Sequence, residues 1–132
     1  MIEHKHLIVK GKMGTILEVP QIEMFLEELI KLLRMKKMET INPNPNVGYQ
    51  KGKNGGVTGV AIITTSHLVI HTWDRTKDFQ LDVYSCKNYD IDKVLNFLNK
   101  WDLLEEDYKF FDRKYNIIEE DSDIMPSGDK NE

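Results

Sequence analysis

The side chains that could carry out nucleophilic or acid-base chemistry are concentrated between residues 58 and 86. Ser66 offers a hydroxyl, His71 an imidazole, and Cys86, the single cysteine of the chain, a thiol. A serine hydroxyl acts as a nucleophile only beside a group that takes its proton, and an imidazole both accepts and returns protons near neutral pH. Taken alone, Ser66 would more simply cap a turn and Cys86 would be a core thiol. Their surroundings therefore have to decide between these interpretations.

Three consecutive predicted strands position these side chains. One is a nearly continuous apolar run and two alternate apolar with polar residues. They are Val57–Thr65, His67–Trp73 and Phe79–Cys86. If the last two pair around a turn centred near Thr76, Ser66 lies opposite Cys86. With that pairing His71 points to the other face of the sheet unless the strand bends, and a slip of one residue would reverse this.

The remaining elements are predicted from apolar periodicity and from turn residues. A helix begins after Pro20, and Asp90 caps a second helix. The other predicted segments are a strand at His4–Lys10, the first helix at Gln21–Met35, a loop at Asn42–Gly55 and a last strand at Tyr108–Tyr115. The order βαβββαβ predicts an α/β (α+β) two-layer sandwich, a mainly antiparallel sheet with two helices on one face.

Size and charge limit the classes of function. The 132 residues suffice for one domain, predicted at 1–118, followed by an acidic disordered tail at 119–132. The chain carries −4 and the tail −5, so the predicted domain is nearly neutral and has no field that would gather nucleic acid or an anionic membrane. There is no long apolar span or signal-peptide pattern, and the lone cysteine fits a reducing compartment. We expect a cytoplasmic protein with a small-molecule ligand.

Two other kinds of site are not expected. His67 and His71 are four residues apart in a predicted strand, which places them too far apart for a zinc pair, and no acidic residue or cysteine at suitable spacing completes a ligand set with His4 and His6. We therefore predict no metal site. The glycine-rich stretch Gly52–Gly59 lacks the order of a phosphate-binding loop.

The stretch GVTGVAIITTSHLVIHTW, residues Gly56–Trp73, resembles a known family when it is read together with Cys86. It is similar to the bacterial and archaeal S-adenosylmethionine decarboxylases, which have a GVSG-like turn, an apolar strand, Glu-Ser-His, L-x-I-H-T-W and a cysteine twenty residues past the serine. The resemblance runs from about His6 to Cys86 and more weakly through the second predicted helix.

The resemblance implies that the chain processes itself. The Ser66 hydroxyl would attack the carbonyl of Thr65, and β-elimination would split the chain into residues 1–65 and 66–132. Ser66 would become a pyruvoyl group, the only cofactor, which forms a Schiff base with the substrate amine and accepts the electrons left by the departing CO₂. The family pattern assigns His71 as the base in processing, Cys86 as the proton donor to the decarboxylated carbon, and Thr58 as a hydroxyl that assists processing.

Three departures from the family pattern concern the substrate. Thr65 replaces the glutamate before the nucleophile, Arg75 replaces an acidic residue, and the aromatic ring expected before GVSG is absent. Tyr49 could stack on the substrate instead, and Arg75 favours a carboxylate over a sulfonium cation. We expect the substrate to contact Thr65, His67, Arg75 and Tyr49.

The sequence thus predicts a lyase that decarboxylates S-adenosylmethionine for spermidine and other polyamine biosynthesis. The resemblance also implies a homodimer or a dimer of dimers with active sites at subunit boundaries. Two alternatives stay open. One is a decarboxylase of the same fold that acts on ornithine or arginine. The other is an unprocessed, non-catalytic homologue that binds a nucleoside or a partner subunit.

Overall fold

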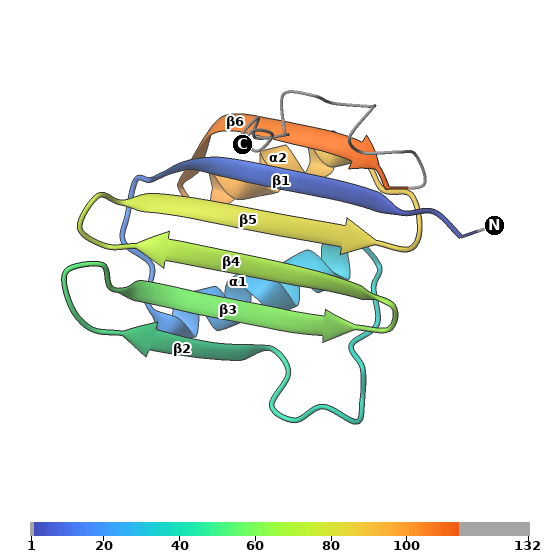
Figure 1. Cartoon of the computed structure of the whole chain (residues 1–132), viewed down its shortest axis with the longest axis horizontal. Coiled ribbons are helices and arrows are strands. Elements are labelled where there is room, and N and C mark those ends of the chain that lie inside the picture. Colours follow the sequence, from blue (N-terminus) through green and yellow to red (C-terminus); the bar gives the residue numbers. More distant parts are fainter. Residues whose placement is uncertain (1, 114–132) are drawn as a thin grey trace, which may run out of the picture.

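The protein is described from a computed structural model, which covers residues 2–113. Residues 2–113 form six strands and two helices, whose arrangement is drawn in Figure 1. They are β1 (Lys5–Met13), α1 (Val19–Leu32), β2 (Asn46–Gln50), β3 (Gly56–Ile63), β4 (Ser66–Trp73), β5 (Asp78–Ser85), α2 (Ile91–Lys100) and β6 (Leu103–Asp112). The predicted acidic tail lies outside the described residues.

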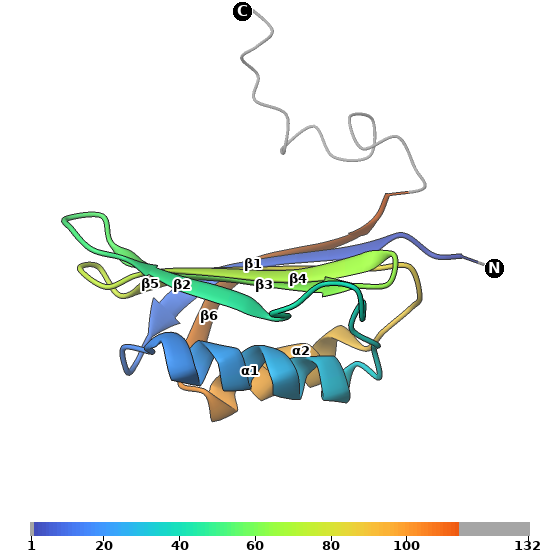
Figure 2. The same cartoon turned by 90° about the horizontal axis from the view of Figure 1, so that it is seen from below.

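The strands form one antiparallel sheet in the order β2-β3-β4-β5-β1-β6 (Figure 1). Both helices cover the same face, as Figure 2 shows, and no element of the described part covers the other. We call this other face the open face. The predicted α/β two-layer sandwich is confirmed, with one strand more than expected.

The core lies between the sheet and the helices. Leu68 and Ile70 of β4 are completely buried, whereas the alternate residues of that strand point to the open face. Each helix contributes an apolar stripe, as the sequence periodicity predicts. The fully buried helix residues are Ile22, Phe25, Leu26, Leu29, Val94 and Leu98.

The helix starts follow from local chemistry. Pro20 lies in the first turn of α1, where its missing N–H costs nothing, and the backbone N–H of Glu18 donates to the Gln21 side chain at 2.9 Å. At α2 the predicted cap is confirmed, because the Asp90 carboxylate accepts from the backbone N–H of Asp92 at 2.9 Å. In the described residues no helix is long and apolar enough to span a membrane.

The additional strand β2 corrects the prediction of a loop over Asn42–Gly55. Asn46–Gln50 pairs with β3, and the half-buried Val47 packs against the core. The Asn44 side chain donates to the Ile62 carbonyl at 2.7 Å and accepts from the Ile62 N–H at 2.9 Å. It thereby acts as a strand partner just before the start of β2, in a segment where Asn, Pro and Gly hide the strand pattern.

Candidate active site

Ser66 is the first residue of β4, directly after a tight turn. Ile63 pairs with Ser66, so Thr64 and Thr65 alone connect β3 to β4. Thr65 has φ of 57°, in the left-handed region that a β-branched residue rarely adopts. Such a conformation costs about 1–3 kcal/mol, which the surrounding pairing must supply. The strained residue is therefore the one that carries the carbonyl next to Ser66.

The Ser66 turn is held on two sides. The N–H of Thr64 donates to the Lys36 carbonyl at 3.3 Å, and the Thr65 hydroxyl donates to the Thr64 carbonyl at 2.7 Å. On the other side, the backbone N–H of Cys86 donates to the Ser66 hydroxyl oxygen at 3.0 Å. The Ser66 oxygen is thus placed by the residue that follows β5.

Cys86 brings its thiol to the same turn. Its Sγ lies 3.0 Å from the Thr65 hydroxyl oxygen, and the side chain is partly buried. Hydrogen bonding to Thr65 and then to Ser66 lowers the pKa of the Cys86 thiol below its ordinary value, against a smaller opposing effect of burial. The structure therefore brings Thr65, Ser66 and Cys86 together.

The register between β4 and β5 differs by one residue from the prediction. His67 lies opposite Tyr84 and not opposite Ser85. The predicted pairing of Ser66 with Cys86 is therefore wrong as a strand register, although the two residues remain in contact beyond the end of β5. The physical reason is the tighter turn at residues 74–77, whose centre lies half a residue earlier than expected.

Thr58 and His71 form a second group on the open face. They are direct partners across β3 and β4, and Thr58 Oγ1 lies 3.0 Å from His71 Nδ1. His71 also contacts the ring of Trp73, with ring centroids 6.1 Å apart. Five residues of extended strand separate His71 from Ser66, about 16 Å at the usual rise per residue. Within one chain the structure does not bring His71 or Thr58 to Ser66.

The predicted substrate contacts Tyr49 and Arg75 lie still farther from Ser66. Arg75 is exposed in the turn that follows β4, at the end of this strand opposite Ser66. Tyr49 is exposed on the edge strand β2, and the pKa of its phenol is raised by desolvation and by the negative charge of Asp74. These two residues share one end of the sheet and do not approach the turn of their own chain.

His67 belongs to a third group, which the sequence did not predict. His6 Nε2 contacts Asp82 Oδ1 closely, and His67 Nε2 lies 3.7 Å from the same oxygen. The pKa of Asp82 is lowered, because hydrogen bonds and charge from the two histidines outweigh its burial. Sequence spacing indicated no acidic partner for His6, whereas the fold brings Asp82 from a distant strand beside both His6 and His67. Their common face, together with Asp82, follows from strand alternation only when the register is known.

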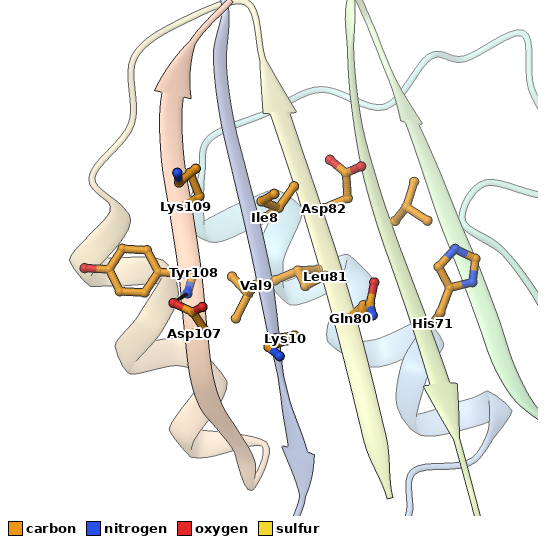
Figure 3. A pocket seen from close by; sticks show the side chains of 11 residues that line it. Ile8, Val9, Lys10, His71, Gln80, Leu81, Asp82, Asp107, Tyr108 and Lys109 are labelled. Carbon is orange, nitrogen blue, oxygen red and sulfur yellow. Dashed lines mark hydrogen bonds between the residues drawn. The ribbon is translucent and has the colours of Figure 1, made fainter. Parts of the chain in front are cut away.

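A hollow of about 600 Å³ on the open face lies beside these residues (Figure 3). Lys10, His71, Gln80 and Asp82 line it from β1, β4 and β5. Its volume lies in the range of small-molecule sites, but neither Ser66 nor Cys86 borders it. In the described part of the chain, the candidate nucleophile Ser66 therefore lies outside this hollow.

A protein of known structure has the same kind of fold. The solved structure of the adenosylmethionine decarboxylase from Aquifex aeolicus VF5 has a similar fold, with a TM-score of 0.57 and 23% identical residues. The match covers 93% of this chain and 97% of that chain.

A family model described as S-adenosylmethionine decarboxylase matches residues 6–110. The chain belongs to this S-adenosylmethionine decarboxylase family. The resemblance found in the sequence is thereby confirmed and extends beyond Cys86 through α2 into β6.

The similar curated proteins carry two different names. S-adenosylmethionine decarboxylase proenzymes from Pyrobaculum islandicum and Pyrobaculum arsenaticum are 44% and 42% identical over 41 residues, a match that spans 31% of this chain and only 33% of each relative. An arginine decarboxylase proenzyme from Hyperthermus butylicus is 30% identical over 96 residues, 70% of this chain and 68% of that protein.

Proposed function

We propose that the chain is a self-processing, pyruvoyl-dependent amino-acid decarboxylase in which Ser66 is the precursor of the pyruvoyl group. The observation that carries the proposal is the turn itself. The carbonyl to be attacked belongs to Thr65, whose backbone is strained, and the attacking oxygen is held by a hydrogen bond from Cys86 N–H. Membership of a family whose relatives are named proenzymes supports it.

The proposed processing begins with attack of Ser66 Oγ on the carbonyl carbon of Thr65. A bond forms between these atoms and the peptide C–N bond breaks, which leaves an ester and a free amine on Ser66. Removal of the Ser66 α-proton then breaks the Cβ–Oγ bond and releases residues 1–65 with a carboxylate. The dehydroalanine left at position 66 tautomerises and loses ammonia to water, so that a pyruvoyl group begins the second chain.

The pyruvoyl ketone supplies an electron sink for the loss of CO₂ from the substrate, so the proposed chemistry requires no separate organic cofactor. Cys86 lies beside it and acts as the proton donor to the decarboxylated carbon. A thiol suits this role because its proton is readily given up and the lowered pKa of Cys86 brings it closer to neutral pH.

S-adenosylmethionine is the proposed substrate, and its decarboxylated product would be the aminopropyl donor in spermidine synthesis. Arginine is the specific alternative, favoured by the long match to an arginine decarboxylase proenzyme. The residues proposed to contact the substrate are Tyr49, Thr65, His67 and Arg75.

A homodimer completes the proposed site. His71 is about 16 Å from Ser66 along β4, and Thr58 is the partner of His71 on β3, so both are too far from Ser66 for proton transfer. Two sheets that pack face to face lie about 10 Å apart, with their side chains interdigitated. Ser66 has the same side-chain parity as the buried Leu68 and lies at the end of β4, so a two-fold arrangement would set the β3–β4 turn of one subunit against His71 and Thr58 of the other, and the reverse contact would form as well. The uncovered open face supports this arrangement.

Intact mass spectrometry of the purified chain tests the processing. We expect two fragments, residues 1–65 and a pyruvoyl-blocked 66–132, while Ser66→Ala stays whole as the control. Purified wild type that stays whole after long incubation would contradict the mechanism and favour a non-catalytic homologue. The processed protein is then incubated with S-adenosylmethionine, arginine and ornithine in turn, and the amine that appears as product identifies the substrate.

A further inference from the structure

We propose that His6, His67 and Asp82 bind one divalent transition-metal ion on the open face, with Zn²⁺ as the ion that fits their chemistry best. The inference does not rest on the proposed decarboxylation. It begins from three side chains that the fold brings together from three neighbouring strands.

The sheet register fixes the three side chains on one face. His6 and His67 both lie opposite Tyr84, on the two sides of β5. Asp82 is two residues from Tyr84 on that strand, so its side chain points the same way. Because β4, β5 and β1 are adjacent inner strands, the backbone that carries all three ligands is held by pairing on both sides.

The distances are close to those that a metal ion requires. The three candidate ligand atoms lie within 4.8 Å of one another. Zinc–nitrogen and zinc–oxygen bonds near 2.0–2.2 Å place ligand atoms about 3.3–3.5 Å apart in a tetrahedral site. Since His6 and Asp82 are already closer than this and His67 is 3.7 Å from Asp82 Oδ1, small rotations of the side chains suffice.

The donor types select the kind of ion. Two imidazole nitrogens and one carboxylate oxygen suit Zn²⁺, Co²⁺ or Ni²⁺, whereas Mg²⁺ and Ca²⁺ prefer sites made of oxygen atoms. Three protein ligands leave at least one coordination position for water or another molecule. In the isolated chain His67 and Asp82 each keep 39% of the side chain exposed on the open face, and in the proposed homodimer the free coordination position would face the sheet of the second subunit.

Aromatic rings fix the orientation of the imidazoles. His6 packs against Phe111 with ring centroids 5.3 Å apart, and His67 packs against Tyr84 with centroids 5.6 Å apart. The His6 side chain is only 14% exposed, and its Nδ1 makes no hydrogen bond within residues 2–113. Packing and the contact with Asp82 therefore direct Nε2 of His6, so little side-chain entropy is lost on binding, although the Nδ1–H of His6 has no acceptor among the described residues.

The test titrates Co²⁺ into the full-length chain without an affinity tag, and follows ligand-field absorption, which reports coordination geometry. Equilibrium dialysis with Zn²⁺ then gives the stoichiometry. We expect one ion per chain in the wild type and also in Ser66→Ala, because unprocessed protein has the same three ligands. Metal binding in Ser66→Ala separates this inference from the proposed function, which fails or succeeds on chain splitting.

Matched variants locate the ion. His67→Ala and Asp82→Asn should weaken binding at least tenfold, because even the loss of a hydrogen-bond partner behind a ligand typically costs about 10–100-fold in metal affinity. His71→Ala removes a histidine from the same strand and face, and Cys86→Ser removes the single thiol, yet both should bind as the wild type does. A wild type that binds no Co²⁺ or Zn²⁺ at micromolar concentrations overturns the inference, as does unchanged binding by His67→Ala. If Asp82→Asn does not fold, the half-exposed His67 still supplies this test.

Discussion

At the scale of single residues, Thr65 combines two properties at the proposed cleavage point. Its backbone occupies the left-handed region, and its hydroxyl lies 3.0 Å from the thiol of Cys86. The first property bears on how readily the chain splits, and the second on the acidity of the proposed proton donor. The two can be separated by substitution, because one belongs to the backbone and the other to the side chain.

Relief of the strain at Thr65 should stabilise the unsplit chain. In a Ser66→Ala background, Thr65→Gly should raise the free energy of unfolding by about 1 kcal/mol, since glycine adopts a positive φ without strain but loses more chain entropy. Urea unfolding measures this. Thr64→Gly, in the same exposed turn but with no positive φ, should instead lower stability by about 0.5–1 kcal/mol. Equal losses for both variants would contradict stored strain at Thr65.

Removal of the Thr65 hydroxyl should change the thiol. Hydrogen bonding to Thr65 is the largest cause that lowers the pKa of Cys86, so Thr65→Val should raise that pKa toward its ordinary value. At a fixed pH below both pKa values, less thiolate is then present and alkylation by iodoacetamide should slow. The pH dependence of the alkylation rate measures the shift. Thr64→Val is the control, and a midpoint that moves equally in both variants would argue against the direct contact.

At the scale of elements, the sequence predicted a helix or strand for every observed element except β2, although β6 begins at Leu103, five residues before the predicted start at Tyr108. Continuous apolar runs and strict alternation are strong signals, and they placed β3, β4 and β5 within a residue of their observed starts. β2 lies in a segment dominated by Asn, Pro and Gly, and its pairing depends on contacts with β3 that no local pattern records. The sequence therefore could not predict β2, because this strand depends on pairing with a distant part of the chain.

The same distinction explains the site. Contact between Ser66 and Cys86 was predictable from the family pattern and from a short hairpin. The register was not, because a shift of one residue depends on turn geometry, and that register alone determines which side chains share the open face. His6 comes from a strand far away in sequence, so its meeting with His67 and Asp82 could be seen only in the folded chain.

Asn44 should be the side chain that anchors β2. Asn44→Ala removes both hydrogen bonds to the backbone of Ile62 and leaves the partly buried N–H of Ile62 without this partner, whereas the Ile62 carbonyl still accepts from the N–H of Met38 at 3.0 Å. We expect the free energy of unfolding to fall by about 1–3 kcal/mol, the usual cost of unsatisfied buried polar groups. Urea unfolding measures this loss. Asn46→Ala, at an exposed position of β2, should change it by less than about 0.5 kcal/mol. If the two variants lose similar amounts of unfolding free energy, Asn44 does not anchor β2.

At the scale of the whole molecule, the positions of the Ser66 turn and of the Thr58–His71 pair suit a dimer with two-fold symmetry. Each chain offers the Ser66 turn at one end of β4 and the Thr58–His71 pair farther along on the open face. Neither group alone can both split the peptide bond and take the α-proton. An isologous dimer would place the two different groups against each other twice, so one contact surface generates two equivalent sites.

Complementation between two inactive variants tests this arrangement. Ser66→Ala lacks the nucleophile and His71→Ala lacks the proposed base, so each should stay unsplit when expressed alone. When they are co-expressed, half of the randomly assembled dimers are mixed and one of the two sites in each mixed dimer is intact, so about a quarter of the wild-type number of sites should form. Intact mass spectrometry should then find splitting only in chains that carry His71→Ala, because those chains keep Ser66. Splitting of His71→Ala expressed alone would show that His71 is not the base, and no splitting in the mixture would remove the case for a site shared between subunits.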